Sequence, residues 1–345
     1  MSTPSRPSLV RHWLALAEEL VGRAAPRLDA LNLFPVPDAD TGTNMLATLT
    51  AARTAADACP AQDDAGAVLA HAGAAALDSA RGNSGMLLAV SLAGMAEPLR
   101  GRERVDAFAL AAAFGAADRA ARQALSDPRE GTILTVLSAA ARSLARSSTQ
   151  APDTPAVAGD ADPAVRLGPA VTLMLADCVQ AVEETESLLA PLTRAHVVDA
   201  GAVGLLWVFE ALRAVVTGTP VDEELATALP GYVEGAHAAE GEPAAEPEAP
   251  TEGAVEVMGT LTLTPLAAAE LRRRLTDVGD AVILAPVGTA RDAQGRVPWR
   301  VHVHVPRAED AIGPLRAAGD VEGLAVTDLA EPSHGDAAPD GCHGR

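Results

Sequence analysis

The spacing of apolar residues predicts that the first part of the chain is helical. Between residues 9 and 30 the apolar positions recur every three or four residues, with Glu18, Glu19 and Arg23 on the opposite side, as in an amphipathic helix. Similar patterns predict further helices at about 43–57, 66–80, 86–95, 105–125, 132–147, 164–186 and 205–216. We therefore expect an all-α region over residues 9–217, preceded by a disordered N-terminus at 1–8.

The pattern changes after residue 254. Strand-like segments are expected at 255–263, 281–286, 300–305 and 321–329, and helices at 265–275 and 308–318. The order β-α-β-β-α-β is that of a ferredoxin-like split unit. We therefore expect a small α+β domain at 254–330.

Three stretches lack any such period. Residues 148–163 predict a surface loop, and residues 218–253, rich in Ala, Glu, Pro and Gly, predict an acidic linker. The tail at 331–345, which holds Cys342 and His343, is expected to be disordered.

Composition excludes several classes of protein. The chain is 48% hydrophobic but only 2% aromatic, so its core must be built from Ala, Leu and Val, which favours closely packed helices. A net charge of −20 argues against a nucleic-acid partner. All 26 basic residues are arginine, which excludes a phosphate loop of the Gly-Lys-[Ser/Thr] type.

Cysteines and apolar runs indicate the compartment. The three cysteines are scattered and form no disulfide framework, which fits a reducing cytoplasm. The N-terminus has no apolar signal core, and the most apolar run, residues 197–208, contains Asp199 and is too short to span a membrane. We expect a cytoplasmic protein without membrane insertion.

The segment 32–46, Asn-Leu-Phe-Pro-Val-Pro-Asp-Ala-Asp-Thr-Gly-Thr-Asn-Met-Leu, carries the first candidate chemistry. Its two prolines stiffen the loop that leads to Asp38 and Asp40. Two carboxylates one residue apart before a helix suit Mg²⁺, and free N–H groups at the helix start suit phosphates. The residues that open this helix are Thr41, Gly42, Thr43 and Asn44. The alternative is an ordinary N-cap and turn.

A second loop, Arg81-Gly82-Asn83-Ser84-Gly85, precedes another apolar run. Its glycines allow close approach of a ligand, and Ser84 stands where an N-cap or a phosphate-binding hydroxyl would stand. Arg81 is a candidate for neutralising transferred charge. A tight helix–helix turn and a surface ion pair are the alternatives.

Two more loops place similar residues before apolar helices, namely 127–132, which ends in Gly-Thr, and 197–204, which contains Asp199 and Gly201. Any one of the four loops is explained by capping. Four in one helical region suggest helix N-termini gathered at one end of a bundle to hold an anion.

Segments 32–45, 81–85, 130–136 and 197–204 resemble, in the same order, the four motifs of the nucleotide-binding (DhaL) domain of dihydroxyacetone kinases. They are closer still to the version in the DhaL-type subunit of bacterial fatty-acid kinase. The resemblance covers roughly residues 9–215 and implies an antiparallel eight-helix barrel that binds ATP through Mg²⁺, with one or two ions.

The resemblance also assigns residues to this site. Asp38 and Asp40 match its metal-binding aspartates, with Asn32 near a third ligand position. The positions that match phosphate contacts or surround the nucleotide are Thr41, Gly42, Thr43, Asn44, Gly82, Asn83, Ser84, Gly85, Thr132, Asp199 and Gly201. Ala39 departs from the family, which usually has glycine there, so a left-handed conformation at that point would be strained.

The α+β domain resembles the middle domain of the same fatty-acid kinase subunit, which carries a His-Val-His strand. Here His302 and His304 share one face of residues 301–305, and the three valines face the core. Two such histidines can share a zinc ion. The family completes that site with a cysteine, where Met258 stands here. We therefore expect two half-exposed histidines, with zinc as the alternative. His71 has no partner at metal-ligand spacing and is interpreted as a packed or solvated residue.

These resemblances imply an ATP- and Mg²⁺-dependent kinase subunit. The acceptor would be a fatty-acid carboxylate on a carrier protein, or dihydroxyacetone on an acceptor-binding subunit. A third, C-terminal region of the fatty-acid kinase subunit has no room in this sequence, which bears on docking to a carrier. One alternative is a nucleotide-binding regulator without transfer activity, and another is a purely structural bundle. The oligomeric state is open, with a homodimer as one alternative.

Overall fold

The computed structural model describes residues 6–60, 63–102, 105–149, 163–233, 254–288 and 290–329. The expected disordered tail with Cys342 and His343, most of the expected loop at 148–163 and the acidic part of the linker lie outside the described residues.

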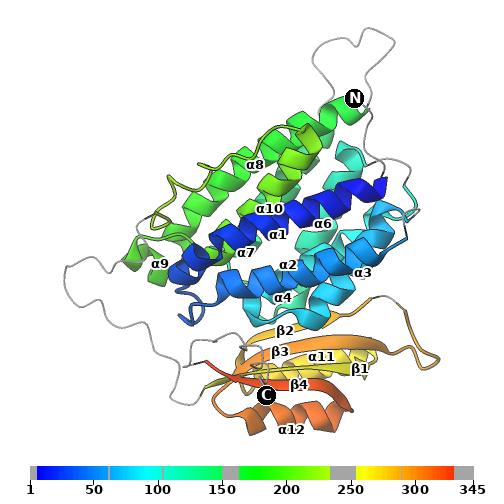
Figure 1. The fold of residues 1–345 in the computed structure, drawn as a ribbon. Coiled ribbons are helices and arrows are strands. Elements are labelled where there is room, and N and C mark those ends of the chain that lie inside the picture. The colour runs from blue at the N-terminus through cyan, green and yellow to red at the C-terminus, as the bar shows by residue number, and fades with distance from the viewer. Residues whose placement is uncertain are drawn as a thin grey trace, which may run out of the picture.

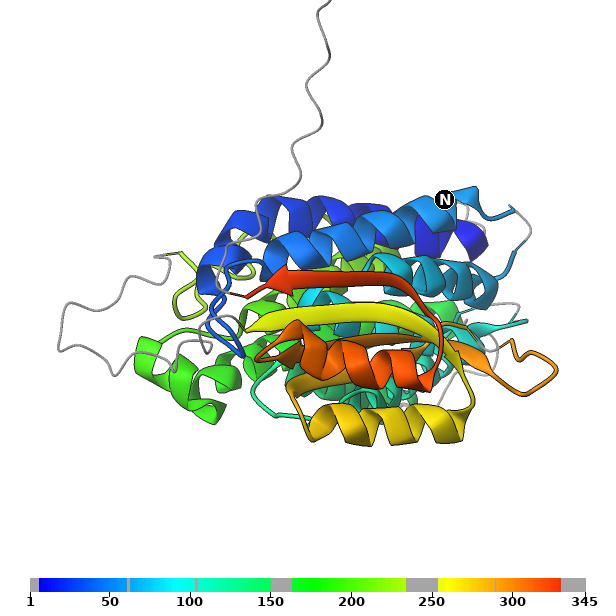
Figure 2. The ribbon, with the colours of Figure 1, turned by 90° about the horizontal axis from the view of Figure 1, so that it is seen from below.

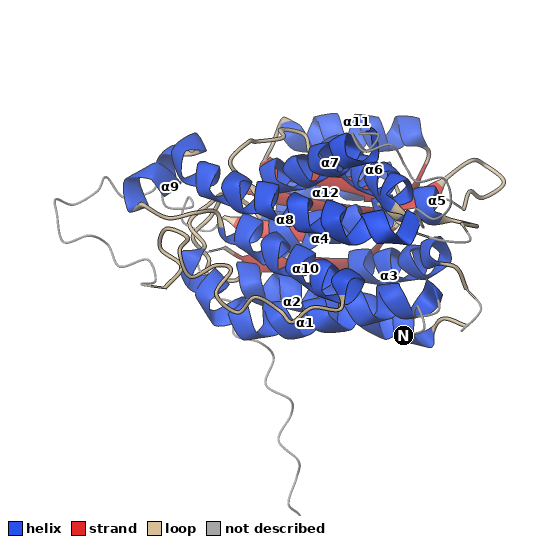
Figure 3. Cartoon of the chain, turned by 90° about the horizontal axis from the view of Figure 1, so that it is seen from above, coloured by secondary structure: helices blue, strands red, loops and turns tan. Residues whose placement is uncertain are grey.

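The first part of the chain is mostly helical, as predicted (Figures 1 and 3). Its helices are α1 (Arg6–Leu31), α2 (Thr41–Ala58), α3 (Ala65–Ser79), α4 (Gly82–Gly94), α5 (Ala96–Leu99), α6 (Ala107–Ala124), α7 (Ile133–Thr149), α8 (Pro163–Leu188), α9 (Ala190–Ala195) and α10 (Ala200–Thr217). The first helix begins at Arg6, three residues before the expected start. The two short helices, α5 and α9, were not predicted because four or six residues show no period.

Contacts join the long helices in a closed series. Each long helix packs against the next one along the chain, from α1 to α8, and α10 packs against both α8 and α1. Buried alanines occupy many of these contacts, as the composition requires. The antiparallel eight-helix barrel stays a prediction in its detail, but the helical class of this region is confirmed.

Helix α10 is buried along most of its length. By length and composition it could cross a membrane, yet 78% of this 18-residue stretch, Ala200–Thr217, is buried within the molecule. All residues from 200 to 212 are buried. The buried environment shows that α10 belongs to the core of the region, which explains its apolar sequence.

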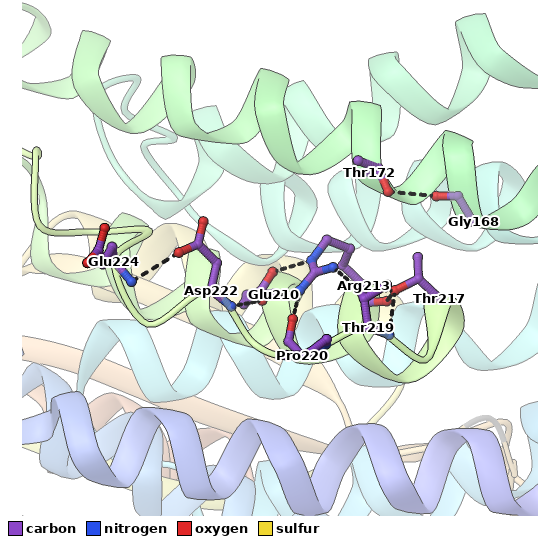
Figure 4. Close-up of polar contacts among 9 residues, drawn as sticks. All are labelled: Gly168, Thr172, Glu210, Arg213, Thr217, Thr219, Pro220, Asp222 and Glu224. Carbon is purple, nitrogen blue, oxygen red and sulfur yellow. Dashed lines mark hydrogen bonds and ion pairs between the residues drawn. The ribbon is translucent and has the colours of Figure 1, made fainter.

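The segment after α10 differs from the linker expected at 218–253. Gly218 ends α10 with φ of 68°. Within α10, Arg213 forms a bidentate ion pair with the fully buried Glu210, and the distance from Arg213 Nη2 to Glu210 Oε1 is 2.6 Å. Arg213 also donates to the Pro220 carbonyl at 2.6 Å, and Glu210 accepts from the Asp222 N–H at 2.7 Å (Figure 4). These bonds hold the chain against α10.

Further along the same segment, Ala226, Leu229 and Tyr232 are buried against the helical core. The expectation of a linker from residue 218 is therefore wrong for 218–233, because a few apolar residues among polar ones are enough to pack a segment that has no helical period.

The second part of the chain has the predicted element order. It consists of β1 (Val255–Leu263), α11 (Pro265–Thr276), β2 (Asp280–Pro286), β3 (Val297–Val305), α12 (Ala308–Ala318) and β4 (Val321–Asp328). The strands form an antiparallel sheet in the order β2-β3-β1-β4. The sequence thus predicted the number and order of these elements correctly.

The sheet lies between the helical region and the helices α11 and α12 (Figures 1 and 2). One face carries apolar residues that pack on α11 and α12. On the other face Met258, Ile283 and Ala285 join the core of the helical region. Ile283 also forms an isolated antiparallel bridge with Leu125, and the Ser126 N–H donates to the Val282 carbonyl at 3.0 Å. The two parts of the chain therefore share a packed and hydrogen-bonded interface.

Candidate functional site

The loop between α1 and α2 holds the paired acids. The Phe34–Pro35 peptide bond is cis, and the buried Asn32 donates from Nδ2 to Asp38 Oδ1. Asn32 therefore lies beside the acids, and its role as a third metal ligand stays a prediction. Ala39 has φ of 54°, the left-handed conformation that the family's glycine would adopt without strain.

Asp40 occupies the N-cap position of α2, but its side chain makes no capping hydrogen bond. Asp29 of α1 does this instead, since its carboxylate accepts from the N–H of Gly42 at 2.6 Å and from the N–H and hydroxyl of Thr43 at 3.1 and 2.8 Å. The interpretation of Asp40 as an ordinary cap is thereby wrong. Because another carboxylate satisfies the helix start, the Asp40 side chain is left for the cavity beside it.

A narrow cavity of about 30 Å³ lies where the first two motifs meet the α+β domain. The motif residues that line it are Asn32, Asp38, Asp40, Thr41, Asn44, Gly82, Asn83 and Ser84. Glu256 of β1 and His304 of β3 line it from the other side. The paired acids and the segment Gly82-Asn83-Ser84 therefore face one space, as the nucleotide-site hypothesis requires. A cavity of this size has room for a water molecule or an ion.

The carboxyl groups at this cavity have perturbed pKa values. Burial raises the pKa of Asp38, and burial together with the charges of Asp38 and Glu256 raises the pKa of Asp40 to about 8. Burial also raises the pKa of Glu256, but the hydrogen bond and charge from His302, together with the Gly82 N–H, outweigh it and lower the pKa to about 2. Carboxylates that repel one another in this way favour a bound cation.

A second, larger cavity of about 610 Å³ adjoins the first. Asn83 and Ser84 line both, and so do Phe34 and Pro35 of the acidic loop. The larger cavity adds Thr132 and Asp199 from the third and fourth motifs, and the segment 279–282 closes it from the α+β domain. All four motifs thus contribute to two adjoining cavities, and the larger has the volume of a small-molecule site.

The fourth motif is built for close approach. Asp199 caps α10 by accepting from the Ala202 N–H at 2.7 Å, and burial raises its pKa to about 7. A Cβ on Gly201 would lie 2.9 Å from Ser84 Oγ, so any other residue there would have to displace the Ser84 hydroxyl. Gly201 therefore positions Ser84 without lining either cavity.

Some expected residues have local structural roles. A Cβ on Gly42 would lie 2.5 Å from the Ala25 carbonyl oxygen, so Gly42 lets α2 pack on α1, and a Cβ on Gly85 would lie 2.8 Å from Thr48 Oγ1. Thr43 is hydrogen-bonded to Asp29. Arg81 is exposed and lines neither cavity. These four residues are not brought to the cavities.

Glu256 is a site residue that the sequence patterns did not single out. Its Oε1 accepts from the Gly82 N–H at 3.0 Å and lies 2.9 Å from His302 Nδ1. The ligand atoms of Glu256, His302 and His304 lie within 4.8 Å of one another, and all three residues are buried. The expectation of half-exposed histidines is wrong, because this face of the sheet is covered by the helical region.

The signal for Glu256 was present in the sequence. The register pairs Glu256 with His304 and Met258 with His302 on the neighbouring strands, so residue 256 shares the histidine face as residue 258 does. A carboxylate at 256 thus takes the place expected for the missing thiolate, and buried Glu, His and His form a donor set suited to zinc.

Comparisons with known proteins agree with the motifs. The family model of the DAK2 domain matches residues 35–214. Protein YloV of Bacillus subtilis is 33% identical over 211 residues, which cover 61% of this chain and 35% of that protein. The uncharacterized protein SH1689 of Staphylococcus haemolyticus is 32% identical over 198 residues, covering 57% of this chain and 33% of that protein. The aligned part thus spans about a third of the length of these relatives.

Proposed function

The chain belongs to the DAK2 domain family, the DhaL-type family expected from the four motifs, and on that premise we propose that it is a kinase subunit that uses ATP and Mg²⁺. The acceptor would be held by a partner protein in the cytoplasm. A fatty-acid carboxylate on a carrier is the acceptor that the resemblance favours, and dihydroxyacetone is the lesser alternative.

One observation carries this proposal: the paired acids and the turn at 82–84 line the same narrow cavity, which adjoins a larger one. Asp38 and Asp40, whose pKa values are both raised chiefly by burial, fit a hard cation with oxygen ligands. Bound Mg²⁺ would supply neutralisation of phosphate charge.

The chain's own residues would then bind and position the nucleotide. Asn83 and Ser84 stand between the two cavities, where they would contact the phosphates, while Thr132 and Asp199 would contact the rest of the nucleotide in the larger cavity. Phosphoryl transfer needs little more from a protein than such positioning and charge neutralisation. Because Arg81 is exposed and outside both cavities, our proposal gives it no contact with the phosphates.

A second candidate function is a nucleotide-binding regulator without transfer activity. Two observations favour it. Ala39 holds a left-handed conformation that costs an alanine roughly 1–2 kcal/mol. Glu256 already accepts the Gly82 N–H, a donor that a phosphate would otherwise use.

Calorimetric titration with Mg-ATP tests the site. Replacing Asp38→Asn together with Asp40→Asn should weaken binding at least a hundredfold, about 2.7 kcal/mol. Asp106→Asn is a matched control, because Asp106 caps α6 at the end away from the cavities. Equal affinity in the double variant would remove the proposed metal role. Wild-type protein that binds Mg-ATP but forms no acyl phosphate with any fatty-acid carrier would favour the regulator.

A further inference from the structure

A second group of metal-ligand atoms lies at the opposite end of α2 from the paired acids. Cys59, Asp63 and His71 each offer one ligand atom, and these atoms lie within 4.8 Å of one another. The sequence showed no partner for His71, because its partners come from the turn between α2 and α3. We propose that this corner binds a zinc ion that clips the end of α2 to α3.

Hydrogen bonds hold the backbone at Cys59 and at Asp63, the residues that supply two of these ligands. Arg11 of α1 donates to the carbonyl oxygens of Ala56 at 2.8 Å, Cys59 at 2.7 Å and Pro60 at 3.2 Å. The Asp63 N–H donates to the same Pro60 carbonyl at 3.2 Å. Cys59 and Asp63 are therefore positioned through their backbone groups. The Cys59 thiol donates to the Ala55 carbonyl oxygen at 3.3 Å, a bond that zinc ligation would replace.

His71 makes a hydrogen bond of the kind that metal-binding histidines usually make. Its Nδ1 lies 2.9 Å from the Ala67 carbonyl oxygen, one helical turn earlier. When Nδ1–H donates to that carbonyl, Nε2 carries the free lone pair, and such an outer hydrogen bond typically fixes the ligating tautomer. Because His71 is exposed and the other two ligands are half-buried, an ion can enter from solvent.

The donor set favours zinc. Sulfur, nitrogen and oxygen ligands bind zinc at roughly 2.0–2.3 Å, and a tetrahedral site with three protein ligands leaves one position for water. Separations of up to 4.8 Å between ligand atoms need only a small closure of side chains to reach such bonds. Burial and the Asp63 charge raise the pKa of the Cys59 thiol, whereas Arg11 opposes this rise. Binding releases the thiol proton to solvent and forms the zinc–thiolate bond.

This site is separate from the proposed nucleotide site. Helix α2 has 18 residues between its first residue, Thr41, and its last, Ala58. At 1.5 Å per residue the two ends lie about 27 Å apart. Zinc binding at this corner therefore does not depend on nucleotide binding. It gives His71, which lies outside the four motifs, a role as a metal ligand.

Cobalt titration tests the proposal, because only a thiolate ligand gives the sulfur-to-cobalt charge-transfer band. The Glu256, His302 and His304 group has no thiolate, and a Cys342→Ser background removes the cysteine of the tail. In that background we expect one equivalent of Co²⁺ to produce the band and Zn²⁺ to displace it. Cys59→Ser should abolish the band, and His71→Gln should weaken Co²⁺ binding at least tenfold.

His12→Gln is the matched control, since His12 is an exposed histidine of the same region outside this group. Melting curves in EDTA check that all variants fold. Absence of the band in the Cys342→Ser background overturns the proposal, and so does a band that survives Cys59→Ser. Co²⁺ affinity that is the same for His71→Gln and His12→Gln also overturns it.

Discussion

At the two central strands, β1 and β3, both faces of the small sheet are largely buried but differ in chemistry. On strand β3, Val301, Val303 and Val305 pack with α11 and α12 in an apolar core. The alternate residues, Arg300, His302 and His304, lie on the face that meets the helical region and are at most 9% exposed. The strand thus alternates between a core and a polar interface.

The difference shows which face serves stability. Polar groups in an interior cost free energy unless they are paired, and apolar replacements there are often neutral or stabilising. Among the described residues, Arg300 Nε and His302 Nε2 are buried with no hydrogen-bond partner. We infer that the valine face holds the domain together, while the polar face is retained for binding.

The largest expected effect concerns the apolar face. Leu271 of α11 is 1% exposed and packs on the valines, so Leu271→Ala should lower the free energy of unfolding by about 3 kcal/mol. Leu266, on the same helix, is 81% exposed, and Leu266→Ala should change stability by less than about 0.5 kcal/mol. Urea unfolding measures both. Equal costs would show that this face is not a core.

The next effect concerns the polar face. If Glu256, His302 and His304 bind zinc, Zn²⁺ at a hundred times its Kd should stabilise the chain by about 2.7 kcal/mol. We expect this in a Cys59→Ser background, which removes the other candidate zinc site, and expect its loss after His304→Gln. His12→Gln serves as the control in thermal unfolding. A zinc effect that persists in His304→Gln would contradict the assignment.

A third prediction concerns pH. Burial and the charges of Asp38 and Glu256 raise the pKa of Asp40 from 3.8 to about 8, so the native state keeps a proton that the unfolded state releases. Without metal, the contribution of this carboxyl group to stability should therefore be fully present below about pH 4 and be lost as pH rises to about 8. Mg²⁺ should offset the fall. Thermal unfolding in EDTA over this pH range measures the fall in stability. If stability falls equally steeply with pH in Asp40→Asn, the Asp40 carboxyl group is not its cause.

The smallest effect concerns the acidic loop that meets the polar face. Ala39 lies between Asp38 and Asp40 with φ of 54°. Ala39→Gly removes the strain of the left-handed conformation but also raises the conformational entropy of the unfolded chain. The net effect expected is a stabilisation of about 0.5–1 kcal/mol. Ala58→Gly at the exposed end of α2 should instead destabilise. Chemical unfolding compares them, and destabilisation by Ala39→Gly would show that the loop carries no strain.

Periodicity predicted the elements closely. The expected helix at 308–318 and strand at 255–263 have the same bounds in the structure. The alternation at 301–305 correctly separated the histidines from the valines. Such patterns are local, because side-chain direction follows from backbone period alone.

The sequence pattern did not predict which distant residues contact each face. Asp29, instead of the Asp40 side chain, accepts from the N–H of Gly42 at the start of α2, thirteen residues later in the chain. Glu256 accepts from the Gly82 N–H, 174 residues away. Neither partner shares a period with the residue that it contacts. For the same reason the structure alone groups Cys59 and Asp63 with His71.

The amino-acid order by itself therefore determined the two-part architecture, the family and the set of motif residues. Tertiary packing decided that the histidines are buried, that a glutamate joins them, and that residues 218–233 belong to the helical region. The physical reason is that the burial of a polar side chain depends on the surface packed against it. That surface comes from a distant part of the chain, and local sequence patterns do not predict which distant segments come into contact.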